Sequence, residues 1–255
     1  MSGAAERTGC VVLDAGNTKT RVAVWRDDPC GAQLWQGGEE LGVLPTPTTT
    51  DPSPAAGVAA LAAGTPTLPS VLVSVSPAAT ERLRERLPAL AVVDHTWDLP
   101  FRCDVEAPER VGADRLCNMA AAAALGRDAV LVVDAGTATT FDLLLAGAFV
   151  GGFIAPGMAL AAEALGERAA RLAPVPFASA PFAPGRNTHD AMQRGAFHVG
   201  VHGVAGVIEA FSARYPDLHV VLTGGCGRYV ATAEQPWDPL WTLRGAAVLW
   251  RRRTA

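Results

Sequence analysis

The feature that most constrains the fold is a short sequence that occurs twice. Residues 14–20 read DAGNTKT and residues 134–140 read DAGTATT, so the second copy begins about half the chain after the first. Each copy follows an apolar, β-branched run and precedes a second such run, which is the pattern of two strands joined by a glycine turn. A repeat at this separation indicates two similar α/β halves, because solenoid repeats are much shorter.

We therefore predict that each half opens with a β-hairpin and that the two aspartate–glycine turns face each other across a cleft. The boundary is expected near Leu125–Arg127, which gives domains of residues 1–125 and 126–255. Local patterns add a loosely packed connection over 44–70 with one short helix near 55–63, a tight loop over 151–157, and a long helix over 188–215.

Composition limits the class of protein. The chain has 255 residues, of which 49% are apolar, so it can bury a sizeable core. Its net charge of −4 argues against a nucleic-acid partner, which usually meets a basic face. No apolar run reaches the roughly 18–20 residues that span a bilayer, and residues 1–9 are polar, so we expect a soluble cytoplasmic protein without a membrane partner. The five cysteines indicate neither a zinc site nor a disulfide framework.

The first turn has the residues that a phosphate group requires. Gly16 allows the backbone to approach a ligand, and the N–H groups of residues 16–18 can form a small anion-binding nest. Asp14, at the end of a strand, can hold Mg²⁺ through its water shell. The alternative is an ordinary hairpin turn. The second copy favours a phosphate site, because folding alone does not explain why such a turn is kept twice.

A third block, PERVGADRLCN at residues 108–118, combines a carboxylate with an arginine at the start of a predicted helix. Asp114 could accept a proton from a substrate hydroxyl, and Arg115 could bind an anionic group with two parallel hydrogen bonds. On spacing alone, a purely structural role for Asp114 as a helix cap is the simpler interpretation. The P-loop motif G-x-x-x-x-G-K-[ST] is absent from the sequence.

Taken together, these blocks resemble a known family. The sequences DAGNT, VGADR, VDAGTATTFD and GGFIAPG look like the four signature blocks of type III pantothenate kinases, in the same order; they occupy residues 14–18, 111–115, 133–142 and 151–157. Weaker similarities, which extend the match over nearly the whole chain, lie at residues 73–77, 186–188, 223–225 and 243–245. The resemblance implies the duplicated ribonuclease H-like fold shared by actin, sugar kinases and acetate kinase.

The resemblance also implies an activity and a set of cofactors. The family phosphorylates pantothenate with ATP in the first step of coenzyme A synthesis, and it uses Mg²⁺ and a monovalent cation, K⁺ or NH₄⁺. By position, Asp14 would hold Mg²⁺ and Asp134 the monovalent cation. The residues that would contact ATP are Asp14, Ala15, Gly16, Asn17, Thr18, Lys19, Thr20, Arg21 and Thr137.

The remaining implied roles concern pantothenate. Asp114 would be the base, and pantothenate would be contacted by Gly112, Ala113, Asp114 and Arg115, with Arg115 near its carboxylate. Family members are typically homodimers, in which Thr188 would reach the substrate of the neighbouring subunit. Val105 stands where the family usually has a tyrosine, and Phe101 is the nearest aromatic residue. Two alternatives stay open: another small-alcohol kinase or phosphatase of the same superfamily, and a nucleotide-binding regulator without catalysis.

Overall fold

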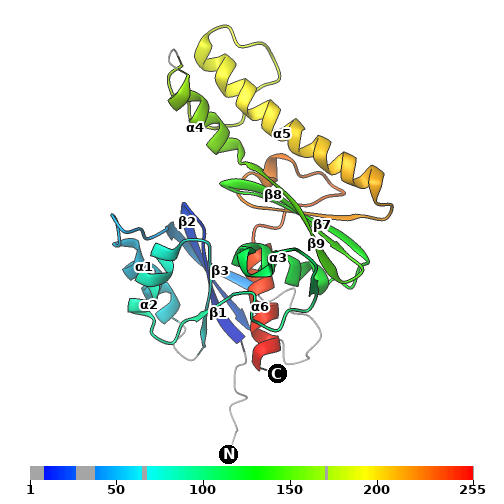
Figure 1. The fold of residues 1–255 in the computed structure, drawn as a ribbon. Coiled ribbons are helices and arrows are strands. Elements are labelled where there is room, and N and C mark those ends of the chain that lie inside the picture. The colour runs from blue at the N-terminus through cyan, green and yellow to red at the C-terminus, as the bar shows by residue number, and fades with distance from the viewer. Residues whose placement is uncertain (1–8, 27–37, 65–67, 170–171, 255) are drawn as a thin grey trace, which may run out of the picture. The chain divides into compact units, whose positions relative to one another are not determined.

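The structure is a computed structural model that describes residues 9–26, 38–64, 68–169 and 172–254. It divides into two compact units (Figure 1). The first unit runs to Gly126 and also takes in the chain from Leu240 onward, while the second comprises Arg127–Pro239. The division falls where the sequence places the boundary, but the last segment, which we expected in the second half, packs in the first unit.

The sheet of the first unit has the strand order β3-β2-β1-β4-β5. These strands are β1 (Gly9–Ala15), β2 (Lys19–Arg26), β3 (Gly38–Pro45), β4 (Ser70–Ser74) and β5 (Ala91–Val92). The first three are antiparallel neighbours, and β4 runs parallel to β1. Residues 10–13 of β1 are buried one after another, as expected for a strand that is covered on both faces.

Helices supply that cover (Figure 1). They are α1 (Pro54–Ala63), α2 (Pro77–Arg86), α3 (Ala113–Ala123) and α6 (Trp241–Thr254), with the short elements β6 (Arg102–Cys103) and η1 (Pro108–Arg110) between α2 and α3. Val58 of α1 and Leu83 of α2 join Leu13 and Leu72 of the sheet in one apolar cluster. The helices α3 and α6 pack against each other and against β4.

The second unit repeats this topology, with the order β10-β7-β8-β9. Its strands are β7 (Ala129–Ala135), β8 (Ala138–Leu145), β9 (Ala148–Pro156) and β10 (His219–Thr223). Again three consecutive strands are antiparallel neighbours, and the fourth is parallel to the first of them. The predicted duplicated α/β fold is therefore confirmed. The connections differ, because α4 (Met158–Arg168) and α5 (Thr188–Arg214) take the place of α1, and η2 (Gly227–Tyr229) follows β10.

The segment 151–157 corrects one prediction. We expected a tight loop from its glycines and proline, but residues up to Pro156 belong to β9, and Gly157 is the N-cap residue of α4. The glycine serves contact between strands instead. A Cβ atom on Gly152 would collide with the carbonyl oxygen of Phe141 on the neighbouring strand β8. Glycine in a strand often marks such a close approach.

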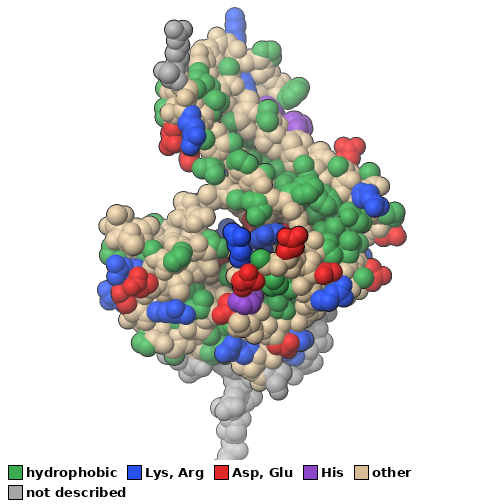
Figure 2. Space-filling model, in the orientation of Figure 1, with side chains coloured by type: hydrophobic (Ala, Val, Ile, Leu, Met, Phe, Trp, Pro, Cys, Tyr) green, Lys and Arg blue, Asp and Glu red, His purple; other side chains and the backbone are tan. Residues whose placement is uncertain are grey.

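Helix α5 corrects the expectation that no segment of the chain is long and apolar enough to cross a membrane. Among the described residues, α5 alone meets that criterion by length and composition, which is weak support for a membrane span. The helix is also largely exposed, since only 17% of its most apolar 18-residue stretch is buried. Val199 is 74% exposed, and Phe182, before the helix, is 83% exposed. Hydrophobic side chains are accordingly visible on the surface of this unit in Figure 2.

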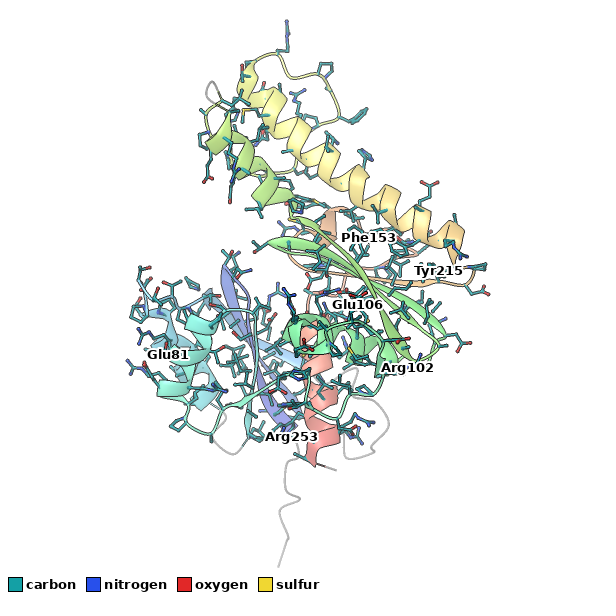
Figure 3. The ribbon with its side chains drawn as sticks, viewed as in Figure 1. Glu81, Arg102, Glu106, Phe153, Tyr215 and Arg253 are labelled. Atoms are coloured by element: carbon teal, nitrogen blue, oxygen red, sulfur yellow. The ribbon has the colours of Figure 1, made fainter. Side chains whose placement is uncertain are left out.

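The arginine run 251–253 belongs to the last turn of α6 and is exposed. The Arg252 guanidinium donates to the Asp98 carboxylate at 2.7 Å and to the Asp98 carbonyl oxygen at 3.2 Å. The Arg253 guanidinium lies 4.8 Å from the centre of the Trp97 ring, and this end of α6 is labelled in Figure 3. A cation–π contact and an ion pair thus hold the last turn of α6 against Trp97 and Asp98.

Candidate active site

The first glycine turn joins β1 to β2. The strand register pairs Asp14 with Arg21 and Ala15 with Thr20. The Gly16 N–H closes the turn by donating to the Lys19 carbonyl oxygen at 3.1 Å. The Asp14 carboxylate is half-buried, whereas residues 17–19 are exposed. A fixed carboxylate thus lies next to an open polar turn, as a phosphate and its metal ion would require.

Beneath this turn lies a threonine pair. Thr20, which we expected among the ATP contacts, is fully buried, and its hydroxyl lies 3.1 Å from the hydroxyl of Thr46. Thr46 directly follows β3, in the segment that we interpreted as loosely packed. The sequence PTPTTT around it is typical of loops, so no signal in the sequence alone singles out Thr46.

The start of α3 holds the second carboxylate. Gly112 is the N-cap residue, and Asp114 Oδ1 accepts a hydrogen bond of 2.8 Å from the Arg115 N–H. Burial raises the pKa of the Asp114 carboxyl above its ordinary value, while that hydrogen bond and the Arg115 charge act in the opposite direction. A Cβ atom on Gly112 would lie 2.5 Å from Asp114 Oδ1, which explains the glycine in VGADR. Asp114 is therefore not the N-cap residue itself, and its raised pKa makes it a stronger proton acceptor than an ordinary aspartate.

The segments that carry Asp14 and Asp114 meet at Val75, which directly follows β4. The Val75 N–H donates to the Ala15 carbonyl oxygen at 3.3 Å, and a Cβ atom on Gly112 would lie 3.6 Å from Val75 Cγ1. Cys117 lies one turn after Asp114 on α3 and is buried. Burial raises the pKa of the Cys117 thiol well above its ordinary value, and the charges of Asp14 and Asp114 raise it further. The contacts at Val75 place the end of β1 and the start of α3 side by side in the first unit.

The segment before α3 contains Val105, which stands where the family usually has a tyrosine. Val105 is half-buried between β6 and η1, and Phe101 is 7% exposed, inside the first unit. Arg115 is half-buried. Its positive charge lowers the pKa of the Cys103 thiol, although burial of that thiol has the larger, opposite effect.

The second turn, in the other unit, is tighter than the first. Ala135 pairs with Thr139, one residue nearer than in the first hairpin, and the Gly136 N–H donates to the Ala138 carbonyl oxygen at 3.0 Å. The Asp134 carboxylate is half-buried, and Thr137 is exposed. Gly224, with φ of +76°, lies against it, because a Cβ atom there would collide with Asp134 Oδ1. This contact explains the TGG block at residues 223–225.

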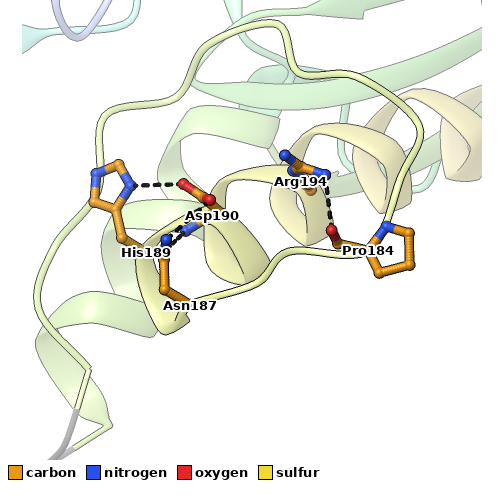
Figure 4. Close-up of polar contacts among 5 residues, drawn as sticks. All are labelled: Pro184, Asn187, His189, Asp190 and Arg194. Carbon is orange, nitrogen blue, oxygen red and sulfur yellow. Dashed lines mark hydrogen bonds and ion pairs between the residues drawn. The ribbon is translucent and has the colours of Figure 1, made fainter.

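Thr188 is the first residue of α5 and is exposed. Asn187 caps the helix by accepting from the Asp190 N–H at 2.9 Å, and Arg194 donates to the Pro184 carbonyl oxygen at 2.9 Å (Figure 4). An open pocket of about 560 Å³ adjoins this helix start; it is lined by Leu165, Leu172, Arg186, Thr188 and Met192, among others. The structure therefore places Thr188 at a firmly capped helix start.

Comparison with known proteins decides the family. A family model of the type III pantothenate kinases matches residues 10–210. The chain belongs to this family. A type III pantothenate kinase from Paramagnetospirillum magneticum is 32% identical over 96% of this chain and 97% of that protein. Another, from Thermomicrobium roseum, is 43% identical over 53% of this chain, and that match spans about half of its own length, 52%.

Solved structures agree with the fold. A Baf family transcriptional activator from Campylobacter jejuni superposes with a TM-score of 0.56 and 18% identity, over 96% of this chain and 100% of that one. At this identity the likeness supports the duplicated α/β architecture alone. Two of the family's four signature blocks form the glycine turns, and a third forms the start of α3. The fourth forms the end of β9 and the N-cap residue of α4.

Proposed function

We propose that this chain transfers the γ-phosphoryl group of ATP to pantothenate and forms 4′-phosphopantothenate, the first step of coenzyme A synthesis. The observation that carries the proposal is the match of the family model to residues 10–210, which includes Asp14 and Asp114 in two signature blocks whose segments both contact Val75. Phosphoryl transfer needs mostly positioning and charge neutralisation, and this arrangement offers one carboxylate for each of two tasks.

In this proposal the two carboxylates have different partners. Asp114 accepts the proton of the pantothenate hydroxyl as its oxygen attacks the γ-phosphorus and the bond to the ADP oxygen breaks. Gly112, Ala113 and Arg115 contact pantothenate, with the guanidinium on its carboxylate. Asp14 is assigned to Mg²⁺ because it is half-buried beside the open turn. Mg²⁺ neutralises phosphate charge when it is bound. ATP is assigned to residues 14–21 and to Thr137.

The test is ADP release measured in a coupled assay with pantothenate, ATP and Mg²⁺, with the product identified by mass. We expect turnover that requires pantothenate. Turnover with other small alcohols but not with pantothenate would favour a different kinase of the superfamily. ATP binding without any turnover would favour a nucleotide-binding regulator. A cytoplasmic location and the lack of nucleic-acid and membrane partners stay predictions.

We assign the monovalent cation to Asp134. This carboxylate lies beside the backbone of Gly136 and Gly224, and the buried hydroxyl of Thr140, its register partner, has no hydrogen-bond partner within the described part of the chain. A large, weakly hydrated cation can be held by one carboxylate together with carbonyl and hydroxyl oxygens. The alternative is that Asp134 only stabilises the turn.

We expect Asp134→Asn to lose activation by K⁺ or NH₄⁺ while its Mg²⁺ dependence changes less, because the amide removes the charge that attracts the cation. Turnover in Tris buffer, with and without added K⁺, measures this effect. The assignment fails if the wild type is not activated, or if the variant keeps the same fold-activation.

We also propose that two copies of the chain assemble through α5. The support is the exposure of Val199 and Phe182, together with the low burial of the whole helix. Apolar surface of this kind marks interaction sites in soluble proteins. In such a dimer Thr188 would reach the partner's substrate. Light scattering should give the mass of two chains, and the mass of one chain would refute the proposal.

Val105 offers a test of substrate recognition. We expect Val105→Tyr to lower the KM for pantothenate, because it restores the aromatic residue that the family usually has at this half-buried position. Steady-state kinetics at saturating ATP would show the change, with the KM for ATP as the internal control. An unchanged or higher KM would show that the pocket here is built differently.

A further inference from the structure

We propose that Thr46 and Thr20 are positioning residues that orient the first glycine turn for nucleotide binding. This inference rests on the proposed function only in assigning ATP to the turn. Thr46 directly follows β3 and Thr20 lies in β2, and both side chains are buried, at 6% and 0% exposure. Neither hydroxyl faces solvent, so their effect on a ligand would pass through the turn.

The hydrogen bonds form a chain with a defined direction. The Thr46 hydroxyl donates to the Gly16 carbonyl oxygen at 2.8 Å. A hydroxyl has a single hydrogen, and that of Thr46 is used in this bond. In the 3.1 Å contact between the two hydroxyls, Thr20 is therefore the donor. The chain runs from Thr20 to Thr46 and ends on the backbone of the glycine turn.

Thr46 also holds the other side of the turn, because its backbone N–H donates to the Thr18 carbonyl oxygen at 3.0 Å. One residue thus fixes the carbonyl groups of both Gly16 and Thr18. In a planar trans peptide the N–H of the next residue points opposite to the carbonyl. When the Gly16 carbonyl is held towards Thr46, the Asn17 N–H is directed to the opposite side, where residues 17–19 are exposed. An anion on the turn would meet this N–H already oriented.

The second turn shows what the pair adds. Thr139 pairs with Ala135 as Thr20 pairs with Ala15, and Gly157 follows the proline of β9 as Thr46 follows the proline of β3. The Gly157 N–H donates to the Thr137 carbonyl oxygen at 3.0 Å, so the backbone bond is repeated.

The side-chain bond is not repeated. Gly157 has no hydroxyl, and a Cβ atom there would collide with the Gly136 carbonyl oxygen. The Thr139 hydroxyl is buried and has no partner among the residues that the structure describes. Of the two related turns, the threonine chain is present at the one to which we assign the nucleotide phosphates and Mg²⁺.

The test replaces the Thr46 hydroxyl by a methyl group. We expect Thr46→Val in the full chain to weaken the binding of Mg²⁺–ATP about tenfold, as the loss of one oriented hydrogen bond implies. Calorimetry gives the dissociation constant, and kinetics should show a matching rise in the KM for ATP, with the KM for pantothenate changed less than about twofold. Thr46→Ser keeps the hydroxyl and should bind ATP like the wild type.

Thr139→Val is the matched control, because it removes a buried hydroxyl from the second turn, and it should leave ATP affinity unchanged. If Thr46→Val is poorly folded, Thr20→Val removes only the first donor of the chain and should still weaken ATP binding. The inference is overturned if the folded threonine variants bind ATP like the wild type, or if Thr139→Val weakens binding equally. A wild type that binds ATP without phosphorylating pantothenate would refute the proposed function. The comparison of ATP binding between the Thr46→Val and Thr139→Val variants would still test this inference. A wild type that does not bind ATP would refute both.

Discussion

Replacing Asp114 by asparagine should lower kcat by about two to four orders of magnitude, the usual contribution of a general base. The amide has nearly the shape of the carboxylate, and its oxygen can still accept the hydrogen bond from the Arg115 N–H. The start of α3 should therefore keep its geometry, and ATP binding should change little. Only the capacity to take up a proton from the substrate hydroxyl is lost.

The measurement is kcat at saturating ATP and pantothenate, with calorimetric ATP binding as the check on folding. Glu81→Gln, which neutralises an exposed carboxylate on α2, is the matched control and should keep wild-type turnover (Figure 3). Retention of more than about a tenth of wild-type kcat would remove Asp114 from the role of base.

The pH profile gives a second readout of the same residue. The base works as a carboxylate, so activity falls as the pH drops through its pKa. Because burial raises the pKa of Asp114, the acid limb of kcat/KM should lie at higher pH than for an ordinary aspartate. A wild-type acid limb at the position of an ordinary aspartate would argue against this assignment.

The sequence predicts the two hairpins well because a repeated motif and its flanking apolar runs determine them locally. It does not predict β3, whose sequence GEELGVLP contains two glycines and two glutamates. This strand is at the edge of the sheet, where charged residues and a terminal proline are tolerated. The loop predicted over 151–157 was wrong for a related reason. Its glycines resemble turn signals, whereas Gly152 serves contact with β8.

The same distinction holds for the candidate site. Asp14 and Asp114 could be proposed because each lies in a compact motif whose residue types suggest a chemistry. Thr46 could not, because its importance comes from contacts with Gly16 and Thr20, which lie far from it in the sequence. The role of α6 was missed for the same reason, since a helix that returns from the C-terminus to the first unit leaves no local signal.

Helix α6 packs closely against α3. The Trp241 indole N–H donates to the Asn118 carbonyl oxygen at 3.2 Å, and the Thr242 hydroxyl donates to the Asn118 side-chain oxygen at 2.9 Å. Gly245 lies one turn further along α6 and faces Cys117, the residue before Asn118 on α3. A Cβ atom on Gly245 would collide with the Cys117 carbonyl oxygen. A glycine is therefore required at this close approach of the two helices.

We expect Gly245→Ala to lower the free energy of unfolding by about 1–3 kcal/mol, the usual cost of overpacking a core. In a helix interior alanine is more favourable than glycine by about 1 kcal/mol. A net loss of stability would therefore show that the collision with Cys117 costs more than this gain in helix propensity. Because α3 carries Asp114 at its start, a shift of the helix should also reduce kcat. The thermal midpoint and kcat of the purified variant measure both effects.

Gly206→Ala in α5 is the control, because a Cβ atom on Gly206 meets nothing within 4 Å in this chain. At equal protein concentration it should be neutral or stabilising, as helix propensity predicts. If Gly245→Ala is as stable as the wild type, then α3 and α6 can separate without cost, and their contact does not hold the base in place. If stability falls but kcat does not, α6 supports the fold of the first unit without determining the position of Asp114.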